Sequence, residues 1–344
     1  MINKFKIRAA VLEKNNHPLV IKNIFLKENI KNKQVLVKIY FSGICGSQIG
    51  EINAVKGKDR YLPHLLGHEA TGEIVKTNNL NSKFKQGDNV ILHWQKTKLK
   101  DSRAPTYFDV KDKKINAGCV TTFNNYAVVS ENRLTKLPKN ISKKDGVLFG
   151  CGLTTAYGSL FNNINKNQIK SKKILLTGFG MIGQIIVSLI NASKGNDITI
   201  VENNKRKINL IKKKYKRIKI LNKLNISNKE FYDVAFETTG QSKLIEFSYN
   251  SIKNNGKLIL IGVPHHLEKI KINTLGINYG KKIIGSYGGN INPKKDIPKI
   301  AKFVLQNKIN LKSFLCGPFE FNKINKVLDK MQNGQIIKKP IIKF

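Results

Sequence analysis

Residues 174–183 read ILLTGFGMIG, a short apolar run that ends in a glycine-rich turn. Gly178, Gly180 and Gly183 form the pattern G-x-G-x-x-G, and an apolar stretch with helical character follows. Glycines at these places permit a tight turn, the close approach of a pyrophosphate, and close packing of a helix on a strand. The stretch predicts a dinucleotide-binding strand, turn and helix, with Gly178, Gly180, Ile182 and Gly183 as cofactor contacts.

An acidic residue follows this turn at a suitable distance. Glu202 ends the next apolar run, DITIV, and lies 19 residues after Gly183. An acid at this place accepts hydrogen bonds from the adenosine ribose diol and repels a 2′-phosphate, which favours NAD over NADP. The basic residues Lys205, Arg206 and Lys207 follow directly and keep NADP open as the alternative. Glu202 and Lys207 are predicted to be cofactor contacts as well.

The two parts of the chain differ in pattern. From residue 173 onward, strands alternate with helical stretches, which is typical of a parallel sheet. Residues 1 to about 150 contain many short β-like runs separated by turn residues, which is typical of a barrel or sandwich. The strongly polar segment 96–114 is interpreted as an inserted loop or lobe. The sequence thus predicts an α/β protein with a β-rich domain and a doubly wound parallel-sheet domain.

The chain has 344 residues and is strongly basic. It contains 62 Lys and Arg residues against 22 Asp and Glu residues, a formal net charge of +40. Only six of the basic residues are arginines, whereas nucleic-acid surfaces concentrate basic residues and favour arginine. Lysine, asparagine and isoleucine rise together, which indicates an AT-rich coding background. We expect no nucleic-acid partner, and a basic nucleic-acid-binding role stays as the weaker alternative.

Targeting and cysteine patterns point to the cytoplasm. The start, MINKFKIRAA, lacks a continuous apolar region, and glycines interrupt the apolar stretch 174–190, so we expect neither a signal peptide nor a membrane segment. The cysteines show no short regular spacing that would indicate a secreted disulfide framework. They are Cys45, Cys119, Cys151 and Cys316.

Two cysteines and a histidine stand in glycine-rich surroundings. Cys45 lies in GICGS, His68 in LGHE, and Cys151 in GCGLTTAYG. Thiolate, imidazole and thiolate suit Zn²⁺, and three protein ligands leave a fourth position for water or substrate. The separations are too long for a zinc finger but suit ligands that converge from distant loops. Taken singly, Cys151 could equally be a core thiol and His68 a hydrogen-bonded core imidazole.

These motifs together resemble the zinc-dependent alcohol dehydrogenases of the medium-chain dehydrogenase/reductase superfamily. The resemblance rests on GICGS, GHEATGEI, GCGLTTAYGSL and GFGMIG in this order, and it extends over nearly the whole chain. It implies a GroES-like catalytic domain made of residues 1–152 and 290–344. A Rossmann NAD-binding domain, residues 153–289, would be inserted between these two segments.

The resemblance also implies roles for individual residues. Cys45, His68 and Cys151 match the ligands of the catalytic zinc. Glu69 matches the neighbouring acid that assists ligand exchange, and Ser47 matches the hydroxyl that relays the alcohol proton.

Two further positions follow from the same resemblance. Trp94 falls where the family places a large substrate-pocket residue, although a core tryptophan is the alternative. Lys338 lies near the place of a basic residue that contacts the cofactor pyrophosphate, but its neighbour Lys339 leaves the register open.

The chain departs from the family pattern in two regions. Gln48 and Gly50 stand where the family usually has Asp and often His, so the proton must leave by another route, such as water or Glu51. The region from Gln95 to Gly118 lacks the four cysteines of the structural-zinc lobe. We expect one catalytic zinc and no structural zinc, with Cys119 as a packing residue.

The sequence therefore predicts an NAD-dependent, zinc-containing oxidoreductase that acts on an alcohol, polyol or sugar, or on the matching aldehyde or ketone. We expect a homodimer or homotetramer from the resemblance. The alternative is a family member that binds NAD but has a non-redox or sensor role.

Overall fold

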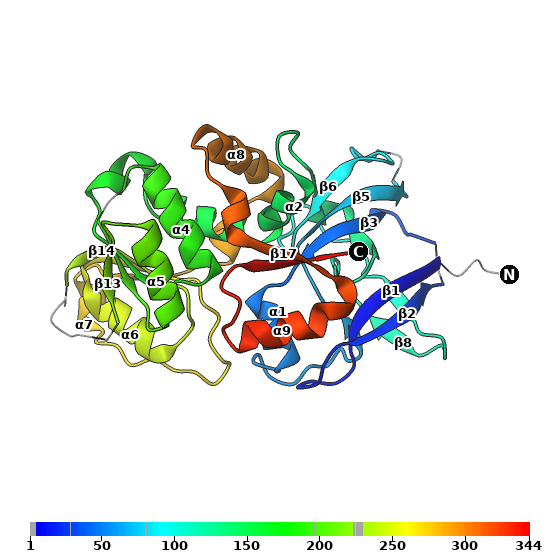
Figure 1. The fold of residues 1–344 in the computed structure, drawn as a ribbon, viewed down its shortest axis with the longest axis horizontal. Coiled ribbons are helices and arrows are strands. Elements are labelled where there is room, and N and C mark those ends of the chain that lie inside the picture. Colours follow the sequence, from blue (N-terminus) through cyan, green and yellow to red (C-terminus); the bar gives the residue numbers. More distant parts are fainter. Residues whose placement is uncertain (1–4, 28, 80, 196, 223, 225–229) are drawn as a thin grey trace. The chain divides into compact units, whose positions relative to one another are not determined.

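The computed structural model describes residues 1–344 except 1–4, 28, 80, 196, 223 and 225–229. The chain forms two compact units (Figure 1). Unit 1 comprises residues 1–154 and 292–344, and unit 2 comprises residues 155–291. The sequence analysis placed the corresponding domain boundaries at 152/153 and 289/290.

Unit 1 contains a small closed barrel and a larger sheet. In the larger sheet the strand order is β10-β6-β5-β3-β18-β17, and β9 also pairs with β3. The barrel order is β1-β2-β7-β8-β4. The barrel strands are β1 (Phe5–Leu12), β2 (Val20–Leu26), β4 (His64–Leu65), β7 (Thr106–Phe108) and β8 (Lys114–Asn116). The sheet strands are β3 (Gln34–Gly43), β5 (Ala70–Thr77), β6 (Asn89–Leu92), β9 (Tyr126–Ser130), β10 (Leu134–Lys136), β17 (Leu315–Glu320) and β18 (Lys339–Lys343).

Alternating residues of β3 form the centre of the core of this sheet. Val35, Val37 and Ile39 are almost completely buried and pack with apolar residues of β5, β6 and β9. Successive side chains of a strand point to opposite faces, so one face of β3 is committed to this core. β18 pairs antiparallel with the end of β3, so that Ile342 lies opposite Ser42. Segments from both ends of the chain thus build the same sheet.

The polar segment 96–114, predicted from the sequence to be an inserted loop or lobe, forms part of the barrel. It contains β7 and the start of β8, which pair antiparallel and belong to the barrel. Tyr107 and Ile115 are fully buried in the barrel core, although their neighbours are mostly polar. Two inward side chains are sufficient to hold such short strands, and the apolar pattern is too brief to recognise in the sequence.

Helices of unit 1 flank the sheet ends. α1 (Gly46–Ile52) begins directly after β3 and shares an apolar core with α9 (Ile324–Gln332). The other helices are α2 (Lys143–Gly146) and α8 (Pro293–Gln306), while α3 (Gly152–Phe161) crosses the boundary into unit 2.

Unit 2 is a six-stranded parallel sheet in the order β13-β12-β11-β14-β15-β16. Counted along the chain this is 3-2-1-4-5-6, the order of a doubly wound dinucleotide-binding fold. The strands are β11 (Ile174–Thr177), β12 (Ile198–Val201), β13 (Lys219–Leu221), β14 (Tyr232–Glu237), β15 (Ile252–Leu260) and β16 (Lys282–Gly285). The helices are α4 (Met181–Ala192), α5 (Lys205–Lys214), α6 (Ser242–Ser251) and α7 (Leu275–Asn278).

The most apolar stretch of the sequence belongs to this unit. Residues 174–190 form β11, the glycine turn and most of α4. All four residues of β11 are buried, as expected for a central parallel strand. Among the described residues, no helix combines the length and apolar character needed to cross a membrane.

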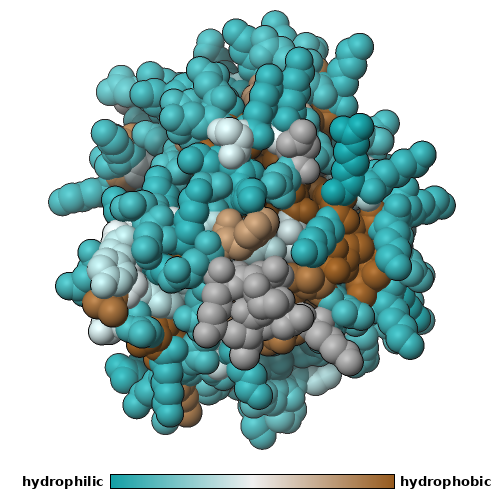
Figure 2. Space-filling model, turned by 90° about the vertical axis from the view of Figure 1, so that its left-hand side faces the viewer, coloured by the Kyte–Doolittle hydropathy of each residue, from teal (hydrophilic) through white to brown (hydrophobic). Residues whose placement is uncertain are grey.

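Hydrophilic side chains cover most of the molecular face in Figure 2, with a smaller hydrophobic area. This face agrees with the strongly basic composition of the chain.

Candidate metal centre and dinucleotide turn

Cys45 lies between the end of β3 and the start of α1. It has extended backbone angles (φ −102°, ψ 154°) and occupies the position just before the helix. The neighbouring Ile44 is fully buried in the core beneath α1. The turn from strand into helix therefore holds the thiol at a fixed place on the edge of the sheet.

His68 and Glu69 lie between β4 and β5. The preceding Gly67 has φ +87°, and a Cβ added there would lie 2.4 Å from Thr122 Oγ1. A larger residue would be both strained and too close to this neighbour. Glycine at this point lets the chain pass close to the 121–123 segment, and His68 and Glu69 then turn inward. Glu69 is completely buried.

Cys151 follows a short 3-10 turn, Val147–Gly150, whose four residues are all buried. A Cβ on Gly150 would lie 2.6 Å from the Leu92 carbonyl oxygen and 2.7 Å from Glu69 Cβ. The absence of a side chain at Gly150 lets this turn pack directly on the strand end. Cys151, which is 8% exposed, is thereby placed next to Glu69.

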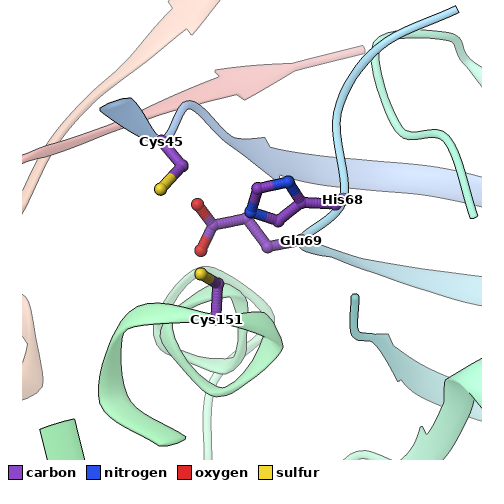
Figure 3. A group of neighbouring side chains, drawn as sticks. All are labelled: Cys45, His68, Glu69 and Cys151. Carbon is purple, nitrogen blue, oxygen red and sulfur yellow. The ribbon is translucent and has the colours of Figure 1, made fainter. Parts of the chain in front are cut away.

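The side chains of Cys45, His68, Glu69 and Cys151 converge on one point (Figure 3). One ligand atom of each lies within 4.8 Å of the others. His68 Nε2 and Glu69 Oε2 are buried and have no hydrogen-bond partner among the described residues. Buried polar atoms normally have a partner, so these two indicate a missing one. Two sulfurs and an imidazole nitrogen suit Zn²⁺, and the site fits that ion.

A buried ion pair adjoins these four side chains. Lys339 is 3% exposed, and its Nζ lies 2.5 Å from Glu69 Oε1. Burial alone would lower the pKa of Lys339, but the nearby Cys45, Glu69 and Cys151 outweigh it and raise that pKa. Lys339 therefore stays charged and compensates part of the negative charge at the centre.

The two thiols differ in their ionisation. The hydrogen bond with Cys151 lowers the pKa of Cys45 well below its usual value, and the charge of Lys339 contributes. The same hydrogen bond raises the pKa of Cys151, and so does burial. Burial opposes the charged form of His68, but contact with the Cys45 sulfur outweighs it and raises the His68 pKa. In this pair Cys45 therefore favours the thiolate form and Cys151 the thiol form.

Gln48 contacts both Cys45 and His68 through one amide. Its Oε1 accepts a hydrogen bond from the Cys45 N–H (2.9 Å), and its Nε2 lies 2.5 Å from His68 Nδ1. An imidazole that binds metal through Nε2 carries its proton on Nδ1, and that N–H needs an acceptor. The Gln48 amide has only one acceptor oxygen. If the amide is rotated, the oxygen faces His68 Nδ1 and the NH₂ group faces the Cys45 N–H, so one of the two N–H groups still lacks an acceptor. A carboxylate would accept from both.

The structure places the other residues predicted in unit 1 as follows. Ser47 is half-buried in the first turn of α1, and its Oγ lies 3.4 Å from Gln48 Nε2. Trp94 is half-buried, and its backbone N–H donates a hydrogen bond to the carbonyl oxygen of Gly150 (3.4 Å), the residue before Cys151. Lys338 is half-buried, and the carbonyl of this residue accepts a weak hydrogen bond from Cys316 Sγ.

Lys339, which the sequence analysis named only as an alternative register, is the lysine that lies at the centre. Its position depends on the register of β18 against β3 and β17. The available signal was the LysLys pair before an apolar run, and this signal does not distinguish the two residues.

The glycine turn of unit 2 leaves room for an anion. A Cβ on Gly178 (φ +87°) would lie 2.6 Å from Thr239 Cγ2, and one on Gly183 would lie 2.4 Å from the Gly178 carbonyl oxygen. By contrast, a Cβ on Gly180 would meet no atom within 4 Å. Gly178 and Gly183 thus permit tight packing, and open space remains at Gly180, where the N-terminus of α4 begins. The residues fit a dinucleotide pyrophosphate.

Glu202 organises the same turn. The carboxylate accepts hydrogen bonds from the N–H groups of Phe179 (2.9 Å), Asn203 (3.0 Å) and Asn204 (3.0 Å). Lys207 Nζ lies 3.2 Å from Glu202 Oε2. Ile182 is half-buried in the first turn of α4. Gly178, Gly180 and Glu202 therefore belong to one local cluster.

Two protein families match parts of this chain. Residues 31–139 match the family described as alcohol dehydrogenase GroES-like domain, and residues 181–306 match the family described as zinc-binding dehydrogenase. Alcohol dehydrogenase-like 5 of Arabidopsis thaliana is 25% identical, and the alignment covers 97% of this chain and 94% of that protein.

Solved structures share the fold. An alcohol dehydrogenase zinc-binding domain protein from Burkholderia ambifaria superposes with a TM-score of 0.87 at 18% identity, covering 99% of this chain and 100% of that one. Acetophenone reductase from Geotrichum candidum, in complex with NAD, has a TM-score of 0.79 at 18% identity, with 98% and 97% covered. The predicted combination of a GroES-like and a Rossmann fold is confirmed. The chain is an oxidoreductase that belongs to the zinc-dependent alcohol dehydrogenase family of the medium-chain dehydrogenase/reductase superfamily.

Proposed function

We propose that this chain is a zinc- and NAD-dependent dehydrogenase that oxidises an alcohol or polyol, or reduces the matching aldehyde or ketone. One observation carries the proposal: Cys45, His68, Glu69 and Cys151 place their ligand atoms within 4.8 Å of one another, and His68 Nε2 has no hydrogen-bond partner among the residues that the structure describes. In the forward direction the alcohol loses a hydride to the dinucleotide and a proton to the protein, so the products are a carbonyl compound, NADH and H⁺.

Cys45, His68 and Cys151 would hold the metal. When bound, zinc supplies a Lewis acid that lowers the pKa of a hydroxyl group, and the dinucleotide supplies the hydride acceptor. Lys339 neutralises Glu69 and so limits the negative charge around the three donors. Ser47 is proposed to accept the substrate proton at Oγ, since a hydroxyl can donate and accept at once. Trp94 is proposed to shape the substrate pocket.

We propose a single zinc per chain. The region from Gln95 to Gly118 contains no cysteine, and this supports the absence of a structural zinc. Cys119 Sγ lies 3.6 Å from the Ser102 carbonyl oxygen, a contact that supports a packing role.

NAD is proposed over NADP. A carboxylate at Glu202, 6% exposed and beside the glycine turn, would repel a 2′-phosphate. Lys207 pairs with that carboxylate and is therefore less available to a phosphate. Gly178, Gly180, Ile182 and Gly183 are proposed to contact the cofactor, and Lys338 stays proposed as a pyrophosphate contact.

We further propose residues 1–154 and 292–344 as the metal and substrate domain, and 155–291 as the dinucleotide domain. Exposed apolar residues near the edge strand β16 support a homodimer or homotetramer. They are Leu275, Ile277 and Tyr279, which are 53%, 47% and 56% exposed.

The test is a metal analysis joined to a substrate panel. We expect about one zinc per chain and NADH formation with at least one class of alcohol, polyol or sugar. A zinc-free active enzyme, or zinc with no turnover in either direction, would contradict the proposal.

A second candidate is a dinucleotide-binding protein without redox turnover. The single acceptor oxygen of Gln48 favours this second candidate. If His68 bound metal through Nε2, its Nδ1–H would face the Gln48 NH₂ group and would lack an acceptor. Tight NAD binding with no turnover despite bound zinc would identify this version.

A further inference from the structure

A cavity of about 530 Å³ adjoins the metal centre on the unit 1 side. His68 and Gln48 form part of its wall, and residues 54–61 and 116–121 form other parts. Since His68 is also a proposed metal donor, a molecule in this cavity lies next to one of the side chains of the candidate centre. The chemistry of the wall therefore bears on the substrate.

Three cations line this cavity. Lys56, Lys58 and Arg60 are exposed, and none makes a hydrogen bond or an ion pair within the described part of the chain. Arg60 is one of only six arginines among the 344 residues, so the lysine-rich composition does not account for it. Cations without a partner at the wall of a cavity are available to an anionic ligand.

The carboxylates of the cavity offset these charges only in part. Asp59 Oδ2 lies 2.7 Å from His64 Nε2, while His64 Nδ1 lies 3.0 Å from the Leu65 carbonyl oxygen, so Asp59 is already engaged. Glu51 also lines the cavity and has no ion-pair partner within 4 Å among the described residues. Burial raises the pKa of Glu51, and His68, His64 and Lys56 oppose that rise. Three unpaired cations thus face one unpaired carboxylate.

The cavity also offers a neutral polar group. Thr121 is 2% exposed and lines the cavity, and its buried Oγ1 has no hydrogen-bond partner among the described residues. A buried hydroxyl without a partner indicates a position that a ligand or water satisfies. Leu65 and Val120 add apolar surface. The wall therefore combines apolar surface with cationic and hydroxyl groups, which suits a molecule that carries both a hydrocarbon part and an anionic group.

We propose that this cavity binds the carboxylate or phosphate group of an anionic alcohol, with Lys56, Lys58 and Arg60 as its specificity residues. The proposal rests on the proposed dehydrogenase function, because the hydroxyl of the same molecule reacts at the centre that His68 helps to form. Thr121 Oγ1 binds a polar group between the two ends of the substrate. Glu51 opposes the binding of the anion.

The test compares matched anionic and neutral alcohols, such as 4-hydroxybutyrate with 1-butanol and glycerol 3-phosphate with glycerol. The triple variant Lys56→Gln, Lys58→Gln, Arg60→Gln is expected to lose about tenfold or more in kcat/KM for the anionic partner only. The control triple variant Lys323→Gln, Lys326→Gln, Lys330→Gln removes the same charge from exposed positions at α9 and should change neither substrate. Glu51→Gln should lower KM for the anionic partner.

Two results would overturn the proposal. One is equal kcat/KM of the native enzyme for anionic and neutral partners, and the other is an equal loss in both triple variants. A binding measurement separates this proposal from the dehydrogenase function. Succinate and inorganic phosphate are titrated calorimetrically into zinc-loaded protein without substrate. If the cavity proposal holds but the dehydrogenase function does not, the anions bind the native protein and no alcohol is turned over. Anion binding then weakens only in the triple variant of Lys56, Lys58 and Arg60. If neither anion binds the native protein, the cavity proposal fails even where alcohols are oxidised.

Discussion

The metal centre of unit 1 and the glycine turn of unit 2 both hold charged groups away from water, but they are assembled differently. Cys45, His68, Cys151 and Lys339 come from four separate segments, and β3, β5 and β18 must pair correctly before they meet. The glycine turn and Glu202 come from one strand-turn-helix-strand segment.

The two regions also differ in what satisfies their charges. Glu202 is satisfied mainly by backbone N–H groups that the local fold provides, with Lys207 as an added partner. In the metal centre, the negative charge of Cys45 and Glu69 is met by the side chain of Lys339. Side chains can be replaced singly whereas backbone groups cannot. Single substitutions should therefore damage the metal centre more than the glycine turn.

Removal of the metal donors should have the largest effect and should separate the two regions. In Cys45→Ser or His68→Ala we expect zinc affinity to fall by more than about 100-fold, because a donor of a three-ligand site is lost. NAD binding to unit 2 should stay within about twofold. Chelator competition measures the first quantity and fluorescence titration of NADH the second, with Cys316→Ser as the matched control. Loss of NADH binding alongside zinc would show that the two regions are not independent.

The substitution Lys339→Met should have the next largest effect, a loss of stability in unit 1. Glu69 would remain buried without its partner, and removal of one member of a buried pair costs roughly 3–5 kcal/mol. Urea unfolding monitored by hydrogen exchange in β3 and β18 should show this loss in unit 1, with β11 and β14 unaffected. The double variant Lys339→Met, Glu69→Gln should recover most of it. If the double variant is no better than the single one, the ion pair is not what stabilises the centre.

The stability of the two units should also depend differently on pH. Burial lowers the pKa of His93 to about 4, and this residue is 1% exposed in unit 1. Its unfolded form takes up a proton near pH 6.5, so stability is full above that pH and falls as the pH drops toward 4, by about 3 kcal/mol at most. The described histidines of unit 2, His265 and His266, are exposed.

Urea midpoints measured from pH 7 to pH 4 should therefore fall mainly in unit 1. His93→Gln should be less stable at pH 7 but should have a flatter pH dependence. An unchanged slope in that variant would assign the acid sensitivity to other groups.

Gly180→Val should weaken NADH binding by about tenfold, or about 1.4 kcal/mol, because the side chain would fill the open space at the turn. Gly285→Val is the matched control, since a Cβ there also meets no atom within 4 Å. Zinc content should be unchanged in both variants. Equal NADH affinity in the two would mean that the pyrophosphate does not lie at Gly180.

Gln48→Glu should give a change of similar size to that of Gly180→Val, but as a gain in affinity instead of a loss. Glutamate has nearly the same shape and offers acceptors to both Cys45 N–H and His68 Nδ1–H. We expect zinc affinity to rise by about tenfold, at the low end of such partner effects on metal binding. Chelator competition at one pH measures it, and Gln48→Met serves as the control that should weaken binding. Weaker binding in Gln48→Glu would show that the added charge outweighs the added acceptor.

The sequence predicted the local region well and the assembled region in part. The fold class, the family and the oxidoreductase activity are confirmed. The strand, turn and helix around Gly178 could be predicted because their signals are contiguous. Cys45, His68 and Cys151 were grouped as a candidate zinc set by their donor types, and the family resemblance then favoured that role over the core role that each residue could have singly.

Lys339 could not be assigned because its role depends on strand register. Along a strand, a shift of one residue moves a side chain to the opposite face, so Lys338 and Lys339 have different surroundings although their sequence context is nearly identical. The buried state of Lys339 follows from the pairing of β18 with β3 and β17, which is a tertiary property. The short strands β7 and β8 were missed for a related reason: each contributes only one fully buried side chain, Tyr107 or Ile115.

The position of β18 also affects the order of biosynthesis. Unit 1 takes strands from before and after unit 2 along the chain, so the ribosome delivers all of unit 2 before β18 emerges. A nascent chain can complete its parallel sheet while the partner of Glu69 is still missing. We therefore expect stable binding of the proposed zinc only after translation has passed Lys339.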